Sequence, residues 1–242
     1  MKFALCRFED EGAWIGRIVL DFAGAVEAAA GRRQAVFHAS LAGGNTPEPA
    51  YRALAAAPSL AALSGKIRIH LWVGDEREVP ADSPSRNGKM IASVFGEGAA
   101  PAPRAAGAPS VASWKHPPVV HLWPEGDREK ACVAYTEEIE KAIGARPAFD
   151  LSVLGMGADG HTAGLFSLAD TMAESLTVTT EAPSHPVSRM TMSAALLKRS
   201  RHTMVLVRGR EKKAMLDKVL KDDRFPLNMA AGSPATIYYL EA

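Results

Sequence analysis

The chain has 242 residues, of which 47% are hydrophobic and 23% charged, the composition of an ordinary globular protein. Its formal net charge of +1 provides no overall field that favours nucleic acid or an acidic membrane, so recognition of an anion has to be local. Apolar runs stay well short of the ~20 residues of a membrane span, and the N-terminus becomes acidic too early for a signal peptide. We therefore expect a cytoplasmic protein.

The hydrophobic pattern alternates between strand and helix along the chain. It predicts strands at 35–40, 67–73, 119–123, 151–155, 187–192, 203–207 and 236–240, and helices at 11–30, 49–57, 88–95, 127–143 and 211–220. Residues 96–118 are rich in Ala, Pro and Gly and are typical of a surface loop. This order predicts an α/β fold in one domain, 1–242, with a mostly parallel central sheet flanked by helices on both faces.

Polar clusters follow several of the predicted strands. They lie at residues 43–47, 75–77 and 155–161, with a weaker cluster at 209–212. Ligands of open parallel sheets bind outside the carboxyl ends of the strands. We therefore expect these four segments to meet at one crevice.

The first cluster reads Gly43, Gly44, Asn45, Thr46 and Pro47. Its backbone N–H groups and the Thr46 hydroxyl could cradle a phosphate at a helix N-terminus. A tight turn in which Thr46 caps the helix explains the same residues. Both interpretations stay open from this motif alone.

The third cluster lies within FDLSVLGMGADGHTAGLF, residues 149–166. The predicted strand is followed by glycine-rich turns and then by Asp159 and His161, where we expect a helix to start. The start of a helix would offer unpaired N–H groups to an anion. The segment also fits G-x-G-x-x-G, but no predicted strand precedes an acidic residue at the distance that a dinucleotide site requires. A nicotinamide enzyme is therefore disfavoured.

The positions of the ionisable residues indicate a structural role for some and a catalytic or binding role for others. His38, His70 and His121 alternate within apolar strands and are expected to be structural. His161 differs from them because it combines a strand end, glycine turns and an adjacent carboxylate. At the ends of other strands, Arg77 could grip a phosphate or carboxylate, although most such charge runs are solvated turns.

The chain contains no G-x-S-x-G elbow and no cluster with metal-ligand spacing. Any reaction would therefore use general acid–base catalysis on water or substrate.

Together, three segments resemble the 6-phosphogluconolactonase family, in the superfamily that also holds glucosamine-6-phosphate deaminase. They are LAGGNTP (41–47), LWVGDEREVPADSPSRN (71–87) and residues 149–166, with weaker matches at 188–191 and 209–212. The resemblance implies a Rossmann-like fold of the deaminase/isomerase/CoA-transferase-like superfamily. It also implies hydrolysis of 6-phospho-D-glucono-1,5-lactone to 6-phospho-D-gluconate, in the oxidative pentose phosphate pathway, with no metal or cofactor.

The resemblance also assigns roles to residues. His161 would be the general base that activates water and then protonates the departing ring oxygen, and Asp159 or Asp75 would orient the imidazole or the sugar. The groups that hold phosphate and stabilise charge would be Gly43, Gly44, Asn45, Thr46, Arg77, Arg189 and Lys212. The expected partner is a small sugar-phosphate lactone, with no nucleic acid and no membrane, and the chain is expected to be a monomer or weak homodimer.

The sequence departs from the family pattern at a few positions. Asn45 and Arg86 each stand where serine is usual, and Arg86 would put an extra cation near the site. Gly164, in place of the usual serine, would loosen the turn after His161.

Two alternatives remain, a glucosamine-6-phosphate deaminase/isomerase and a non-catalytic sugar-phosphate-binding protein. The deaminase motif has a carboxylate five residues past the histidine, where this chain has Phe166, and usually an aromatic residue in place of Arg77. A binding protein would keep the glycine loop but could dispense with His161.

Overall fold

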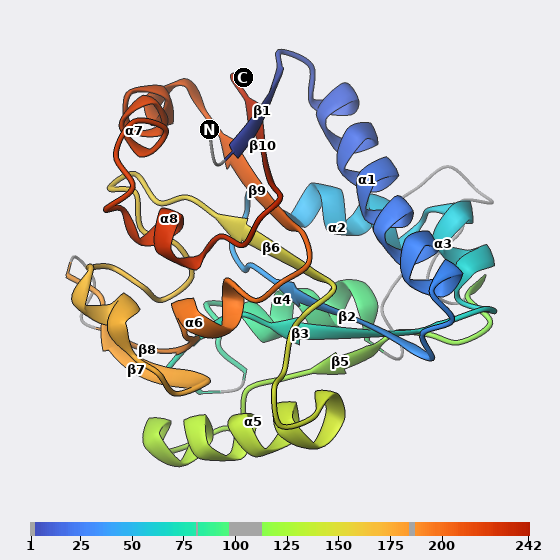
Figure 1. Ribbon diagram of the computed structural model, residues 1–242, viewed down its shortest axis with the longest axis horizontal. Helices are drawn as coiled ribbons and strands as arrows, with labels where there is room; N and C mark the ends of the chain where they lie inside the picture. The colour runs from blue at the N-terminus through green and yellow to red at the C-terminus, as the bar shows by residue number, and fades with distance from the viewer. Residues whose placement is uncertain (1–2, 81, 97–112, 184–186) are drawn as a thin grey trace.

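A seven-stranded, wholly parallel sheet forms the centre of the computed structural model, which describes residues 3–80, 82–96, 113–183 and 187–242 (Figure 1). Its strands are β1 (Phe3–Phe8), β2 (Val36–Leu41), β3 (Arg68–Val73), β5 (Val119–His121), β6 (Leu151–Gly155), β9 (Thr203–Arg208) and β10 (Ala235–Leu240). They lie in the order β1-β10-β9-β6-β2-β3-β5, and every neighbouring pair is parallel. The central strands are continuous buried runs because both faces of the sheet are covered.

Helices cover both faces of this sheet. They are α1 (Glu11–Gly31), α2 (Glu48–Ala55), α3 (Pro58–Leu63), α4 (Asn87–Phe95), α5 (Arg128–Ile143), α6 (Ala194–Leu197), α7 (Lys213–Val219) and α8 (Pro226–Ala230). On one face, Phe22 of α1 lies against Phe37 of β2 with ring centroids 5.8 Å apart. On the other, Tyr135 of α5 lies 5.8 Å from Trp72 of β3. The predicted α/β architecture is confirmed.

A second, three-stranded antiparallel sheet lies beside the carboxyl ends of the large one. It consists of β4 (Asp75–Arg77), β7 (Thr177–Glu181) and β8 (Ser188–Met192), in the order β4-β8-β7. The sequence analysis predicted only β8 and interpreted residues 75–77 as a turn. β4 was not predicted because its three charged residues have no hydrophobic pattern typical of a strand. In addition, its pairing partner β8 is more than a hundred residues away in the sequence.

The helix expected to begin near His161 is absent, so that prediction is wrong. Instead, Thr162 and Leu165 form an isolated antiparallel bridge, and Ala163 has a φ of 48°. The Asp170 carboxylate, within a single 3₁₀ turn η2 (Ala169–Met172), accepts from the backbone N–H groups of the preceding Phe166 (2.9 Å) and Ser167 (2.7 Å). The chain bends here because it must leave the large sheet for β7.

The helix predicted at 211–220 starts as a 3₁₀ turn, η3 (Arg210–Lys212), before α7. Most of the loop predicted at 96–118 lies outside the described residues. Where the chain is described again, the indole of Trp114 is buried and donates to the carbonyl of Ala55 at 3.2 Å.

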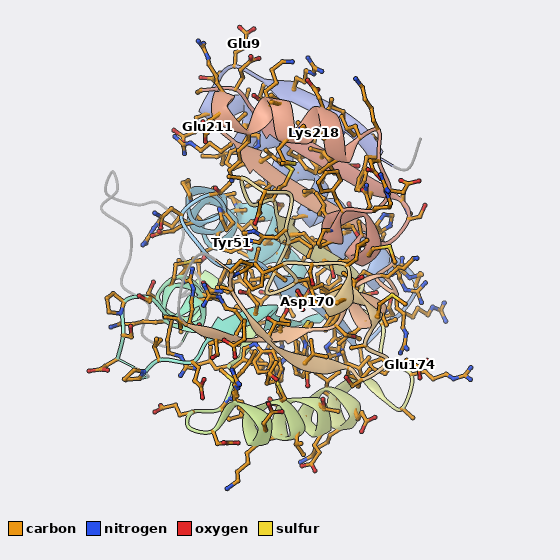
Figure 2. All side chains as sticks on the ribbon, turned by 90° about the vertical axis from the view of Figure 1, so that its left-hand side faces the viewer. Glu9, Tyr51, Asp170, Glu174, Glu211 and Lys218 are labelled. Carbon is orange, nitrogen blue, oxygen red and sulfur yellow. The ribbon has the colours of Figure 1, made fainter. Side chains whose placement is uncertain are left out.

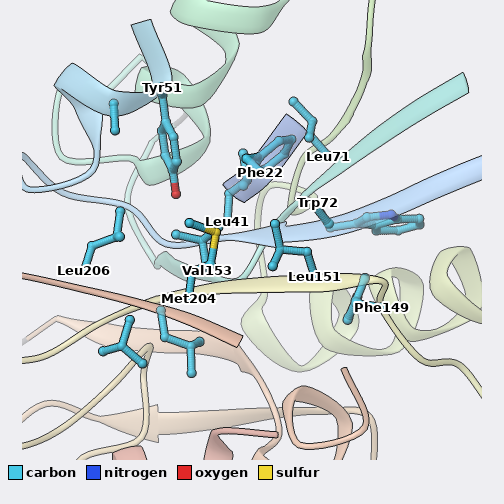
Figure 3. Packing of buried hydrophobic residues seen from close by; sticks show 14 of the residues in the cluster. Phe22, Leu41, Tyr51, Leu71, Trp72, Phe149, Leu151, Val153, Met204 and Leu206 are labelled. Atoms are coloured by element: carbon cyan, nitrogen blue, oxygen red, sulfur yellow. The ribbon is translucent and has the colours of Figure 1, made fainter. Parts of the chain in front are cut away.

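The three strand histidines lie side by side in the face covered by α5. Trp72 Nε1 donates to His38 Nδ1 at 3.1 Å, and its ring stacks on His121 at 3.6 Å. His70 Nδ1 lies 2.9 Å from His121 Nε2. Burial lowers the pKa of both His38 and His70 to about 4. Their predicted structural role agrees with these contacts, and Figure 3 shows the neighbouring apolar core around Trp72 and Phe149.

Candidate functional site

A cavity of about 170 Å³ opens at the carboxyl ends of the parallel strands. Figure 2 looks onto this edge and labels Tyr51, which donates to the carbonyl of Ala42, and Glu211, the neighbour of Lys212. The cavity is lined by Ala42, Gly43, Gly44, Asn45, Thr46, Pro47, Asp75, Arg77, Asn87, Gly155, Met156, Gly157, His161, Thr162, Ala163, Leu206 and Lys212. All four predicted polar segments therefore contribute to one cavity.

A larger cavity, of about 530 Å³, lies between α1 and strands β6, β9 and β10. Its carboxylate, Asp21, is already engaged by the hydroxyl of Tyr238 (2.6 Å) and the guanidinium of Arg17 (2.7 Å). We take the smaller cavity as the candidate site because it gathers ionisable groups and glycine turns.

His161 and Asp159 form a hydrogen-bonded pair at the rim of the cavity. The distance from His161 Nδ1 to Asp159 Oδ1 is 2.5 Å, and the same oxygen accepts the His161 N–H at 3.2 Å. Partial burial favours a higher pKa for the Asp159 carboxyl, but the N–H and charge of His161 outweigh it and lower that pKa. The carboxylate thus holds the Nδ1 proton and leaves Nε2 as the basic nitrogen.

Gly157 makes this pairing sterically possible. A Cβ added there would lie 2.2 Å from two atoms of the His161 ring, closer than real side chains approach. The turn continues through Gly160, whose φ of 87° favours glycine. The glycines seen in the sequence therefore shape the loop that places the His161 imidazole at the cavity.

Asp75 is a buried carboxyl, only 8% exposed, and lines the cavity. Burial raises its pKa to about 6, and the neighbouring Glu76 adds to this, whereas Arg77, Arg189 and His161 act in the opposite direction. Asp75 and His161 line the same cavity, and the charge of His161 acts on the Asp75 carboxyl.

The glycine loop leads into α2 without the cap that one interpretation expected. The helix starts from Pro47, where the described residues supply no side-chain cap, so a capping role for Thr46 is wrong. Gly44 has a φ of 84°. No backbone hydrogen bond from the N–H groups of Gly44, Asn45 or Thr46 is found within the described chain. These three groups border the cavity as available donors.

The predicted cations occupy different positions. Lys212 lines the cavity, donates from Nζ to the carbonyl of Met156 at 2.7 Å, and has a pKa lowered by burial. Arg77 also lines it. Arg189 is not among the described residues that line the cavity; it lies opposite Arg77 in the β4–β8 pairing and donates to the carbonyl of Val187 at 2.7 Å. Burial, followed by the charge of Arg77, lowers the pKa of Arg189.

Asn87 is a lining residue that the sequence analysis did not select. It is 3% exposed at the start of α4, and both ends of its amide are hydrogen-bonded to residues of β4. The only sequence signal was its place in a matching segment, because its contacts depend on the tertiary fold.

Two features are absent from the part of the chain that the structure describes. The described residues contain no group of three or more His, Cys, Asp or Glu side chains that could hold a metal ion. Nor does any helix among them have the length and apolar character to cross a bilayer.

Comparison with known proteins assigns the chain to a family. Residues 9–238 match the model described as glucosamine-6-phosphate isomerases/6-phosphogluconolactonase. The chain belongs to this family. A 6-phosphogluconolactonase of Thermotoga maritima is 33% identical over 205 residues, which cover 83% of this chain and 82% of that protein. Its crystal structure has a TM-score of 0.80 at 30% identity and covers 100% of both chains.

A human relative is longer. The GDH/6PGL endoplasmic bifunctional protein of Homo sapiens is 35% identical over 209 residues. The match covers 83% of this chain but 25% of that protein, so the chain spans about a quarter of its length.

Proposed function

We propose that the protein is a 6-phosphogluconolactonase, which hydrolyses 6-phospho-D-glucono-1,5-lactone to 6-phospho-D-gluconate in the oxidative pentose phosphate pathway. The observation that carries the proposal is the His161–Asp159 pair at the rim of a cavity that also holds the glycine loop, Arg77 and Lys212. It places a base beside groups suited to an anionic ligand. The names of relatives that match most of their length point to the same activity.

The reaction requires one base and a few donors. His161 Nε2 takes a proton from water, and the water oxygen attacks the lactone carbonyl carbon to give a tetrahedral oxyanion. The oxyanion then collapses and breaks the bond to the ring oxygen, which receives the proton from the imidazolium. The product acid releases a proton to solvent. Since a lactone is an activated ester, no covalent nucleophile is needed.

Asp159 orients the imidazole and stabilises its protonated form during this cycle. The N–H groups of residues 44–46, Arg77 and Lys212 share two tasks, binding the phosphate and stabilising the oxyanion. The buried Asp75 orients the sugar or the imidazole from within the cavity.

The deaminase alternative is disfavoured by the residue beside the imidazole. The ring of Phe166 lies 4.8 Å from that of His161, so the position five residues past the histidine supplies an apolar group instead of a carboxylate.

The activity is tested with freshly prepared 6-phosphogluconolactone in an assay coupled to phosphogluconate oxidation, corrected for spontaneous hydrolysis. A parallel reaction with glucosamine 6-phosphate is monitored for ammonia. Enzyme-dependent lactone hydrolysis without ammonia release supports the lactonase. Ammonia release, or binding of sugar phosphates with no turnover of either compound, would replace it by one of the alternatives.

A further inference from the structure

A buried carboxylate, that of Glu76, lies between Asp75 and Arg77, two residues that line the site. Glu76 is 0% exposed and accepts from the backbone N–H groups of Arg77 (2.9 Å), Asn87 (2.8 Å) and Gly88 (2.8 Å). Two of these donors belong to the first turn of α4, whose own N-cap residue supplies no side-chain cap. Glu76 therefore caps α4 from β4 and ties the two elements together, with the positive end of the helix helping to stabilise its charge.

Arg86 is the counterion of this carboxylate. It is 6% exposed, and its Nε lies 3.4 Å from Glu76 Oε2. Its other donors reach the carbonyls of Trp123 (3.0 Å) and Val79 (3.3 Å). The expected extra cation lies near the candidate site, next to the lining residue Asn87, but Arg86 does not itself line the cavity. It neutralises Glu76, because a buried carboxylate needs a partner.

Asn87 connects this buried pair to the cavity. Its Oδ1 accepts from Arg77 Nη1 at 2.9 Å, and its Nδ2 donates to the carbonyl of Asp75 at 2.8 Å. The side chain also occupies the space where a Cβ on Gly43 would be, since that atom would lie 1.9 Å from Asn87 Cγ. One amide thus contacts the glycine loop, Asp75 and Arg77. An aspartate would lack the donor for the Asp75 carbonyl, and alanine would lack both groups.

The hydrogen bond from Arg77 to Asn87 restrains the position of the Arg77 guanidinium. Nη1 is held by Asn87 Oδ1 and by the carbonyl of Ser85. Over the described chain, no hydrogen bond from Nη2 or Nε of Arg77 is found. The guanidinium is therefore fixed on one side and keeps other donors for an anion.

We propose that Asn87 is a positioning residue that presents Arg77 to the anionic substrate, and that the buried Glu76–Arg86 pair holds Asn87 in place. This inference rests on the proposed lactonase for its kinetic readout, whereas its binding readout needs only an anionic ligand. If Asn87 acts through Arg77, the effects of removing the two side chains cannot be independent.

A double-mutant cycle measures this dependence. Asn87→Ala, Arg77→Ala and the double variant are compared with the unmodified protein for kcat and KM with the lactone, and for calorimetric affinity for 6-phosphogluconate and inorganic phosphate. We expect Asn87→Ala to lower kcat/KM and affinity about tenfold, since a hydrogen bond to a charged group is lost. In the Arg77→Ala background, the same substitution should change neither.

A purely structural role gives a different result. Asn87→Ala would then lower the melting temperature and reduce function by the same factor in both backgrounds, which would overturn the proposal. Asn228→Ser is the matched control: this buried Asn donates to the carbonyls of Val219 and Asp222, away from the cavity, and its effects should be independent of Arg77. Asn87→Ser extends the cycle if the alanine variant does not fold. Absence of lactone turnover alongside a coupled loss of phosphate binding would reject the lactonase but retain the positioning role.

Discussion

At the scale of single residues, the two cations that line the cavity are the simplest to test. Arg77→Ala and Lys212→Ala should each weaken binding of 6-phosphogluconate about 10- to 100-fold, because each removes charge-assisted hydrogen bonds to an anion. Isothermal titration calorimetry measures the effect. Lys213→Ala is the control for Lys212, since Lys213 pairs with Asp217 at 3.1 Å and does not line the cavity. Unchanged affinity in both variants would remove these cations from ligand binding.

The glycine next to the imidazole provides a second test at this scale. In Gly157→Ala the new methyl group would occupy the position of the His161 ring, which must then move. We expect kcat to fall about 100-fold, the typical consequence of displacing a catalytic group by ~1 Å. Gly16→Ala is the control because a Cβ there meets nothing within 4 Å.

The activity of Gly157→Ala has to be compared with the thermal stability of the same variant. The melting temperature should stay within a few degrees of that of the unmodified protein, so that lost activity reflects the displaced ring. Full activity in a folded Gly157→Ala protein would mean that the observed ring position is not the working one.

At the scale of elements, the strand histidines make stability depend on pH. Burial lowers the pKa of His38 to about 4, whereas an unfolded chain has the ordinary value of about 6.5. Between these two values the unfolded state binds more protons, so the free energy of unfolding falls as the pH falls from 6.5 towards 4. His38→Asn keeps an acceptor for Trp72 Nε1 but cannot titrate.

Urea denaturation at pH 7 and pH 4.5 measures this contribution. The loss of unfolding free energy between the two pH values should be smaller in His38→Asn than in the unmodified protein or in the surface variant His202→Asn. An equal loss in all three proteins would show that His38 does not couple protonation to folding.

The elements also show what a sequence pattern can reveal. Strands β6 and β9 and helix α1 were predictable because their apolar periodicity is local. β4 was not, because its strand character comes from pairing with β8. The turn after His161 was mistaken for a helix start because the Thr162–Leu165 bridge and the hydrogen bond from Phe166 to the Asp170 carboxylate depend on the route of the chain towards β7.

At the scale of the whole molecule, the main prediction was that distant segments meet at one sheet edge. It followed from parallel topology, since the carboxyl ends of β2, β3 and β6 must share an edge. The individual contacts within that edge were not predictable. Asn87 is held by contacts with all three residues of β4, and Arg86 pairs with Glu76. Glu76 belongs to the polar cluster at 75–77, but the motif does not reveal that its side chain is buried.

The prediction of one domain and that of a monomer or weak homodimer stay predictions. The roles of His161, Asp159 and Asp75 likewise remain proposals, supported by the arrangement of these groups around one cavity.

The most direct test of the account compares the unmodified protein with His161→Ala in the coupled lactonase assay. Removing a general base should lower kcat about 10²- to 10⁴-fold. Affinity for 6-phosphogluconate, measured by calorimetry, should change little because the cations and the glycine loop remain. Turnover of the lactone by His161→Ala at the unmodified rate would contradict the proposed mechanism.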